Sequence, residues 1–90
     1  MGGTDRGRTS RQVALGDRIR ERRHALDISQ EDLAYAAGIN RTYIASLEAG
    51  QRNPSLDMLV RLAVGLGVDV GDLVAGLQAL PQRAVKRPRK

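Results

Sequence analysis

The sequence predicts an all-α fold, a compact domain of five short helices with flexible basic tails. Apolar residues recur at helical spacing through the middle of the chain, and no stretch alternates apolar and polar residues as a half-buried strand does. Helix-capping residues (Ser, Asn and Asp) precede the apolar segments, and glycines follow them. Phe, Trp and Cys are absent from the 90 residues, so the core of this single small domain must be aliphatic.

The chain divides into a disordered N-terminal arm (1–10), a helical domain (11–80) and a basic C-terminal tail (81–90). The arm and the tail lack apolar periodicity and are rich in glycine, polar or basic residues. The net charge of +5 comes from these two ends, because the domain between them has slightly more acidic than basic side chains. A high net charge is therefore poor evidence, by itself, for a nucleic-acid partner.

The first helix is predicted over residues 11–26. Its buried face is marked by apolar residues at helical spacing: Leu15, Ile19 and Leu26. Arg23 falls close to that face, where an arginine is expected only if it is paired. Asp27 follows at a position suited to the left-handed conformation that ends helices, which Asp tolerates less well than Gly.

The next segment predicts two helices joined by a tight turn. Ser29 is placed to cap the second helix, with Asp32 completing a capping-box pair. Gly38 supplies the left-handed residue that ends this helix, and Asn40 caps the third helix, which ends near Gly50. A helix, a short turn containing glycine and another helix form the pattern of a helix-turn-helix motif.

Two more helices are predicted after this motif. Ser55 caps the fourth, which Gly67 ends. Its apolar side consists of Leu56, Leu59, Val60, Leu62, Ala63 and Leu66. Asp69 and Asp72 form a second capping-box pair at the start of the fifth helix, which stops before Pro81. The apolar residues of the fifth helix are Leu73, Val74, Leu77 and Leu80.

The third helix presents an outward face that suits insertion into a groove. Ile44 and Leu47 set the direction of the core, at about 100° per residue. The residues on the other side are small or polar, with one cation at the N-terminal end: Arg41, Thr42, Ala45, Ser46 and Ala49. Small side chains allow the helix axis to approach a partner closely. An ordinary surface helix is the alternative, but such helices usually carry more charge.

If the partner is double-stranded DNA, these side chains have distinct roles. Arg41 can donate two hydrogen bonds to guanine O6 and N7, the commonest specific contact. Thr42 and Ser46 can contact base edges, and Ala45 permits close approach. The candidates for contact with backbone phosphates are Gln30, Tyr43, Gln51, Arg52 and Asn53. Tyr43 can equally pack against the core.

Residues 14–77 resemble the Xre-type (Cro/C1) helix-turn-helix family, which includes phage repressors. The matching residues are Leu15-Gly16, Ile19-Arg20, Arg23, Ser29-Gln30, Leu33-Ala34, Gly38-Ile39, Tyr43-Ile44, Leu47-Glu48, Gly50, Asn53-Pro54-Ser55, Leu62-Ala63, Leu66-Gly67-Val68 and Leu73. The resemblance implies a five-helix DNA-binding domain whose third helix enters the major groove. The positions that it implies for DNA contact are Gln30, Arg41, Thr42, Ser46 and Arg52. It also implies an ion pair between Arg23 and Glu48, which accounts for an arginine beside the core.

Other classes of function are disfavoured. Without cysteine and with a single histidine, His24, the sequence offers no zinc or thiol site, and it has no nucleophile–base pair or phosphate-binding glycine loop. We therefore expect neither enzymatic activity nor a metal or other cofactor. No apolar run is long enough to cross a membrane, and the N-terminus does not resemble a signal peptide. We expect a cytoplasmic protein, associated with the nucleoid of a bacterium.

These observations predict a sequence-specific transcriptional regulator, a repressor that binds a palindromic operator as a homodimer. The expected dimer surface is the apolar side of the fifth helix (Val70, Val74, Leu77 and Leu80), unless these residues complete the core. One alternative is an antitoxin or other protein-binding module whose basic tail docks an acidic partner. Another is a controller protein of a restriction–modification system. The N-terminal arm either adds phosphate or minor-groove contacts or has no role in binding.

Overall fold

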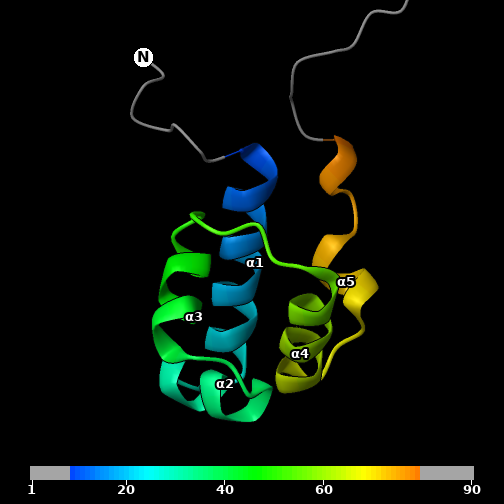
Figure 1. Ribbon diagram of the computed structural model, residues 1–90. Coiled ribbons are helices and arrows are strands. Elements are labelled where there is room, and N and C mark those ends of the chain that lie inside the picture. Colours follow the sequence, from blue (N-terminus) through cyan, green and yellow to red (C-terminus); the bar gives the residue numbers. More distant parts are fainter. Residues whose placement is uncertain (1–8, 80–90) are drawn as a thin grey trace, which may run out of the picture.

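The computed structural model describes residues 9–79, which fold into five α-helices and one 3₁₀ turn, with no strand among them. The elements are α1 (Ser10–Ala25), α2 (Gln30–Ala37), α3 (Arg41–Glu48), α4 (Leu56–Leu66), α5 (Val70–Val74) and the 3₁₀ turn η2 (Leu77–Ala79). α1 runs through the centre, with α3 on one side of it, α4 and α5 on the other, and α2 across the lower end (Figure 1). This arrangement confirms the all-α fold predicted from the sequence.

The helix starts are set by local side-chain caps. Ser29 and Asp32 form the predicted capping box, in which each side chain accepts a 3.0 Å hydrogen bond from the other residue's backbone N–H. The bond from the N–H of Ser29 also lowers the pKa of Asp32. Asn40 caps α3 by accepting from the N–H of Thr42 at 2.7 Å, and Ser55 caps α4. Such caps need only neighbouring residues, which explains why the sequence located them.

The first helix begins earlier than expected. Thr9 and Gln12 form a capping box with hydrogen bonds of 3.1 Å, so α1 starts at Ser10, inside the segment 1–10 assigned to the N-terminal arm. A threonine followed three residues later by a glutamine was the available signal. The rest of the arm and the whole C-terminal tail lie outside the described residues.

Left-handed residues end the helices. Gly38 and Gly67 have φ values of 67° and 70°, as predicted for C-terminal glycines. Asp27 is the sole non-glycine residue with positive φ in the described part of the chain, at 59°. Because a side chain disfavours this conformation, the turn after α1 needs support from outside itself. Arg23 provides it by donating a 3.0 Å hydrogen bond from Nη1 to the carbonyl of Ile28.

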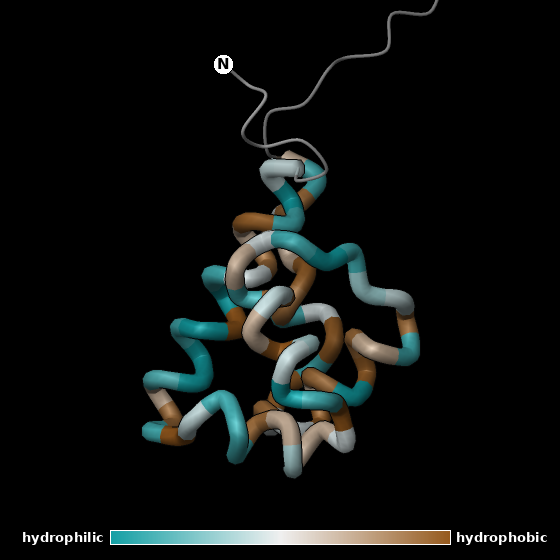
Figure 2. The backbone as a smooth tube through the Cα atoms, turned by 60° about the vertical axis from the view of Figure 1, so that its left-hand side comes forward, coloured by the Kyte–Doolittle hydropathy of each residue, from teal (hydrophilic) through white to brown (hydrophobic). Residues whose placement is uncertain are grey.

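The core is aliphatic and draws on every helix. Its fully buried large side chains are Ile19, Leu33, Ile44, Leu47, Leu62 and Leu66. α2 packs against α4 and α3 packs against α1, and hydrophobic segments concentrate where the helices face one another (Figure 2). Glycines permit both contacts: a Cβ on Gly65 would lie 3.1 Å from the Cβ of Ala37, and one on Gly16 would lie 2.5 Å from the carbonyl oxygen of Leu47.

Three residues that the sequence placed on buried faces are exposed instead. Leu26 is 41% exposed because it follows the last residue of α1, so helical spacing no longer applies to it. Leu56 and Val60 are 70% and 43% exposed. Leu62 and Leu66 define the buried side of α4, and Val60 lies about 200° around the helix from Leu62. A surface helix buries one stripe, and α4 has more apolar residues than its stripe holds.

The predicted fifth helix is broken. α5 ends at Val74, and η2 follows as a separate turn. Between them Ala75 leaves the helical conformation (ψ 129°) and Gly76 is left-handed (φ 76°). Glycine adopts this conformation without a steric penalty, so the helix stops before it. Leu77 still reaches the core, and Leu80 lies outside the described residues.

We expect Gly16→Ala to destabilise the protein. The added Cβ would lie 2.5 Å from the carbonyl oxygen of Leu47 and 2.8 Å from that of Glu48, so α1 and α3 would have to move apart. The loss in free energy of unfolding should be about 1–3 kcal/mol, as for other overpacked sites. Urea unfolding followed by circular dichroism would measure it.

Gly71→Ala is the matched control. No atom lies within 4 Å of a Cβ built at Gly71 in α5. Because alanine has the higher helix propensity, this variant should gain about 0.5–1 kcal/mol. Equal stabilities for the two variants would contradict the close approach of α1 to α3.

Candidate nucleic-acid interface

α3 is held by its core side and presents the other side to solvent. Ile44 and Leu47 are completely buried, whereas Arg41 and Thr42 are exposed and Ala45 is partly exposed. The buried direction is the one predicted from the spacing of these residues. Among residues 9–79 the guanidinium of Arg41 has no hydrogen-bond or salt-bridge partner, so all its donors are available to a ligand.

Glu48, the last residue of α3, is buried and forms an ion pair with Arg23 of α1. Nε of Arg23 donates to Oε2 at 2.7 Å and Nη2 donates to Oε1 at 2.9 Å. Arg23 and Glu48 are only 8% and 5% exposed. Two parallel hydrogen bonds between charged groups fix both side chains, and burial excludes competing water. The C-terminal end of α3 is therefore tied to α1, by the pair that the family resemblance implied.

Two further side chains join this pair. Gln30, the first residue of α2, donates from Nε2 to Oε1 of Glu48 at 3.1 Å, and Arg20 donates from Nη1 to the backbone carbonyl of Glu48 at 3.2 Å. The amide of Gln30 has a second hydrogen to donate, so its bond to Glu48 does not exclude a phosphate contact. That contact stays a prediction. The sequence reasoning missed Arg20. Its spacing of three residues from Asp17, with which it forms a salt bridge, was the available signal.

The carboxylate of Glu48 stays charged despite its burial. Burial alone raises the pKa of Glu48, but hydrogen bonds from Arg23 and Gln30 and the nearby positive charges outweigh it. The pKa of Glu48 is therefore below its ordinary value. The hydrogen bond that Arg23 donates to Glu48 likewise raises the pKa of Arg23, against the opposing effect of burial. Both groups are ionised at neutral pH.

Three side chains predicted separately, two of α3 and one of the loop after it, form one cluster. Arg52, in the loop after α3, donates from Nε to Oγ of Ser46 at 2.9 Å, and its guanidinium lies over the ring of Tyr43, 5.1 Å from the centroid. Ser46 donates from Oγ to the carbonyl of Tyr43 at 3.0 Å. The face of the ring attracts the cation, so the two contacts together hold Arg52 in one orientation.

The remaining predicted residues stay apart from this cluster. Gln51 and Asn53 are exposed in the loop between α3 and α4, and their phosphate contacts remain predictions. The base contacts of Thr42 and Ala45 remain predictions too. Tyr43 packs against the core, one of the two roles open to it, and its ring also supports the guanidinium described above.

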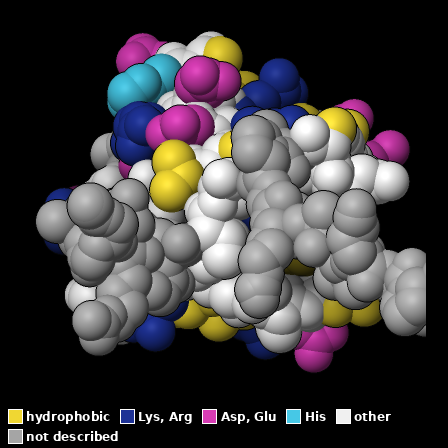
Figure 3. Space-filling view, turned by 90° about the horizontal axis from the view of Figure 1, so that it is seen from above, with side chains coloured by type: hydrophobic (Ala, Val, Ile, Leu, Met, Phe, Trp, Pro, Cys, Tyr) yellow, Lys and Arg dark blue, Asp and Glu magenta, His cyan; other side chains and the backbone are white. Residues whose placement is uncertain are grey.

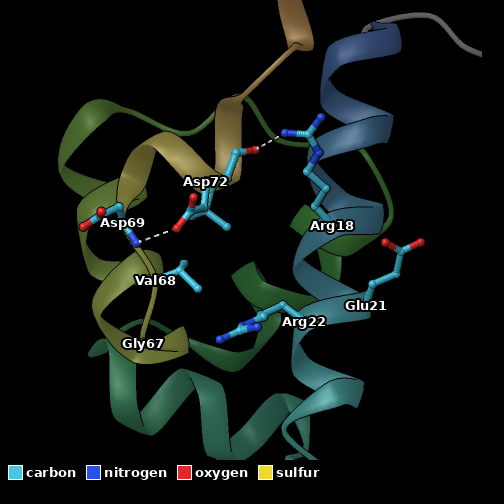
Figure 4. A pocket seen from close by; sticks show the side chains of 8 residues that line it. Arg18, Glu21, Arg22, Gly67, Val68, Asp69 and Asp72 are labelled. Carbon is cyan, nitrogen blue, oxygen red and sulfur yellow. Dashed lines mark hydrogen bonds between the residues drawn. The ribbon is translucent and has the colours of Figure 1, made fainter.

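Two other parts of the described surface have mixed charge. On the face shown in Figure 3, basic and acidic side chains intermingle around the single histidine. A hollow between α1 and the turn from α4 to α5 also carries both signs (Figure 4). Its charged lining residues are Arg18, Glu21, Arg22, Asp69 and Asp72. As predicted for the start of α5, Asp72 accepts a 3.2 Å hydrogen bond from the N–H of Asp69.

Between residues 9 and 79, no helix combines the length and apolar character needed to span a bilayer. No group of three or more potential metal-binding side chains comes together in the same part of the chain. The face in Figure 3 and the hollow in Figure 4 thus show no surface of uniformly positive charge.

The helices around α3 match a known protein family. A family model described as helix-turn-helix matches residues 19–73, from the middle of α1 to α5. The chain belongs to the Xre-type helix-turn-helix family of DNA-binding regulators. This confirms the resemblance seen in the sequence.

Relatives of this Xre-type protein include regulators of two kinds. The HTH-type transcriptional regulator DdrOP3 of Deinococcus deserti is 40% identical over 78 residues, and the match spans 78% of this chain but only 60% of DdrOP3. Control protein C.BamHI of Bacillus amyloliquefaciens is 38% identical over 64 residues, 70% of this chain and 79% of that protein. Among solved structures, the restriction-modification controller protein C.AhdI from Aeromonas hydrophila has 40% identity and a TM-score of 0.70, covering 72% of this chain and 98% of that one.

We expect Glu48→Gln, which keeps the shape of the side chain but removes its charge, to lower the free energy of unfolding at pH 7 by about 3 kcal/mol. Arg23 would then be buried without a counter-charge. The pKa of Glu48 in the folded protein lies below its value of about 4.3 in the unfolded chain. The stabilisation contributed by the charged carboxylate is therefore fully present above the unfolded pKa and is lost as the pH falls through the folded pKa. The difference between wild type and variant should therefore shrink in acid.

Melting temperatures at a series of pH values would measure this dependence. Glu21→Gln is the control, because Glu21 is an exposed acidic residue of α1 and its change should stay within about 0.5 kcal/mol. A Glu48→Gln variant as stable as wild type at pH 7, or a difference independent of pH, would contradict the stabilising charge.

Proposed function

We propose that the protein is a sequence-specific repressor of transcription, binding a palindromic operator as a homodimer with α3 in the major groove. The geometry of α3 is the observation that supports this best. Its C-terminal end is anchored by Glu48, while Arg41 is exposed at its N-terminal end, the end that reaches base edges in helix-turn-helix proteins. The small side chain of Ala45 lets the helix axis approach the bases.

The residues around α3 would divide base reading from phosphate binding. Arg41 would bind guanine O6 and N7, a pairing that discriminates between bases by about 1–3 kcal/mol. Thr42 would contact a neighbouring base edge. Gln30, Gln51 and Asn53 would bind phosphates, which position the helix without reading sequence. Because few other long polar side chains lie on α3, sequence-dependent DNA shape would supply part of the specificity.

A second copy of the chain would dock on the outer side of α4. Leu56, Val60 and Val64 follow one another at intervals of four residues there and form an apolar stripe, with Leu56 70% and Val64 71% exposed. Exposed apolar stripes of this kind mark interaction surfaces. We prefer this stripe to the surface expected on the fifth helix, because Leu77 is buried in the core and Val70 and Val74 pack partly against it. Leu80 lies outside the described residues.

Charges beside this stripe suit a two-fold pairing of α4 with α4 of the second copy. Asp57 and Arg61 lie one residue after Leu56 and Val60, on one side of the stripe. If the two helices packed antiparallel around Val60, Asp57 of each copy would come near Arg61 of the other, whose Nη1 already donates to the carbonyl of Gly38 at 2.9 Å. A standard interface buries roughly 800 Å² on each partner. A stripe of three side chains on one helix of 11 residues is too short to supply such an area by itself. We therefore expect a weak dimer that DNA stabilises.

A controller protein of a restriction–modification system is the second candidate function. It is favoured by the similarity to C.AhdI, which extends over 98% of that chain. Such a protein would use the same face of α3, so the two functions differ in the genes they regulate. Restriction and methyltransferase genes beside this gene would favour the second. No finding favours an antitoxin role, and the basic tail on which it depended lies outside the described residues.

Selection of binding sites from random DNA should recover an inverted repeat with half-sites about 34 Å apart. Arg41→Ala should lose its preference at one base pair in each half-site and keep its melting temperature, because Arg41 is exposed. Arg22→Ala, which removes an exposed arginine of α1, should keep the full preference. Binding without sequence preference at two salt concentrations would refute the repressor function, and uniform loss in Arg41→Ala would show a phosphate contact instead.

Val64→Lys should prevent dimer formation, because each added charge would be buried against the apolar side chain of Leu56 of the other copy. Sedimentation with and without operator DNA would show it: two copies of wild type bind an operator together, whereas copies of the variant bind each half-site independently and with lower affinity. Tyr35→Lys is the control, since Tyr35 is 91% exposed and belongs to a different helix, α2. A Val64→Lys variant that dimerises like wild type would exclude this surface while leaving DNA binding intact.

A further inference from the structure

The hydroxyl of Ser46 is already engaged within the protein. It donates its proton to the carbonyl of Tyr43 at 3.0 Å and accepts from Nε of Arg52 at 2.9 Å. A serine hydroxyl has one proton and two lone pairs. In this arrangement no proton remains for an acceptor on a base edge, such as guanine O6 or thymine O4. Ser46 therefore lacks the donor that a base-reading role on those atoms requires.

Arg52, unlike Ser46, still has hydrogen-bond donors that could bind a ligand. Its Nε is bound to Ser46 and its guanidinium carbon lies over the ring of Tyr43, but the side chain is exposed. Among residues 9–79 its two terminal nitrogens have no hydrogen-bond partner. They carry four N–H donors in a planar fork, which matches two oxygens of a phosphate. The cation is thus held in place on one side and open to a ligand on the other.

We propose that Ser46 and Tyr43 pre-organise Arg52 as a clamp for one DNA phosphate, and that Ser46 acts through Arg52 instead of reading a base. The proposal rests on the proposed function, in which α3 enters the major groove. A long arginine side chain in a loop normally loses conformational freedom when it binds. The contacts with Ser46 and Tyr43 remove that freedom beforehand, so the phosphate contact costs less on binding. Ser46 is in this sense a positioning residue.

The effect of such a clamp should not depend on sequence. A phosphate contact strengthens binding to every duplex, whereas a base contact strengthens binding to one base pair. Loss of Arg52 should also reduce the dependence of affinity on salt, because each phosphate neutralised adds about 0.9 to the slope of log K against log salt concentration. These two properties separate a phosphate clamp from base reading.

A double-mutant cycle tests the proposal with Ser46→Ala, Arg52→Ala and the double variant. Affinities would be measured for the selected operator and for a scrambled duplex of equal length. We expect Ser46→Ala to weaken binding to both duplexes by the same factor, about 2- to 10-fold for one lost hydrogen bond. In the Arg52→Ala background the same change should have almost no further effect. Arg52→Ala should lower the salt slope by about one phosphate contact.

Arg22→Ala gives the matched control for removal of an exposed arginine, and its salt slope should change less than that of Arg52→Ala. Site selection with Ser46→Ala should return the wild-type consensus. A changed base at one position, with no coupling to Arg52, would overturn the proposal and make Ser46 a base-reading residue while the repressor function stands. If wild type itself yields no consensus, the repressor function fails, and the cycle on the scrambled duplex still decides whether Ser46 acts through Arg52.

Discussion

The buried ion pair between Arg23 and Glu48 is the contact on which the arrangement of the helices depends. One guanidinium binds the carboxylate at the end of α3 and the carbonyl of Ile28 after α1. Removing two charges from water is costly, and it is tolerated when their donors and acceptors are satisfied. Every buried side-chain nitrogen and oxygen among the described residues has a hydrogen-bond partner. Apolar side chains could fill this space, but they would lack the hydrogen bonds that join the end of α3 to α1.

The same carboxylate also links the two helices of the motif. Gln30 at the start of α2 binds Glu48 at the end of α3, so these helices share one anchor. The unfavourable left-handed conformation of Asp27 is tolerated because Arg23 holds the chain just after it. Restraint is therefore concentrated at one end of α3. At the other end the side chain of Arg41 has no such partner among residues 9–79, as a group that must meet a ligand requires.

Two arginines, one in α3 and one in the loop after it, show how neighbouring side chains determine what an arginine can bind. Arg41 is unsupported, so it can adjust to the edge of a base. Arg52 is held by a hydroxyl and a ring, so it presents its terminal nitrogens in one direction. A group that reads a base gains from adjusting its position, whereas a group that binds phosphate gains from being fixed in advance. In the function proposed here, sequence reading and positioning on the backbone are divided between these two arginines.

The sequence by itself determined where most helices start and end and which side of α3 faces outward. Those features depend on hydrogen bonds and spacings within three or four residues, as in the capping box of Ser29 and Asp32. Only the tertiary structure decided that Leu26 and Val60 are exposed and that the fifth helix breaks at Gly76.

The same division applies to the candidate site. The residues of α3 could be predicted one by one, but the contact of Arg52 with Ser46 depends on the path of the loop after α3. Likewise, Gln30 could be seen as a polar residue at a helix start, while its bond to Glu48 exists because α2 and α3 cross at that point. Caps and turns are set by neighbours along the chain. Burial and side-chain pairing depend on how loops and helices are brought together in the fold, which no local pattern records.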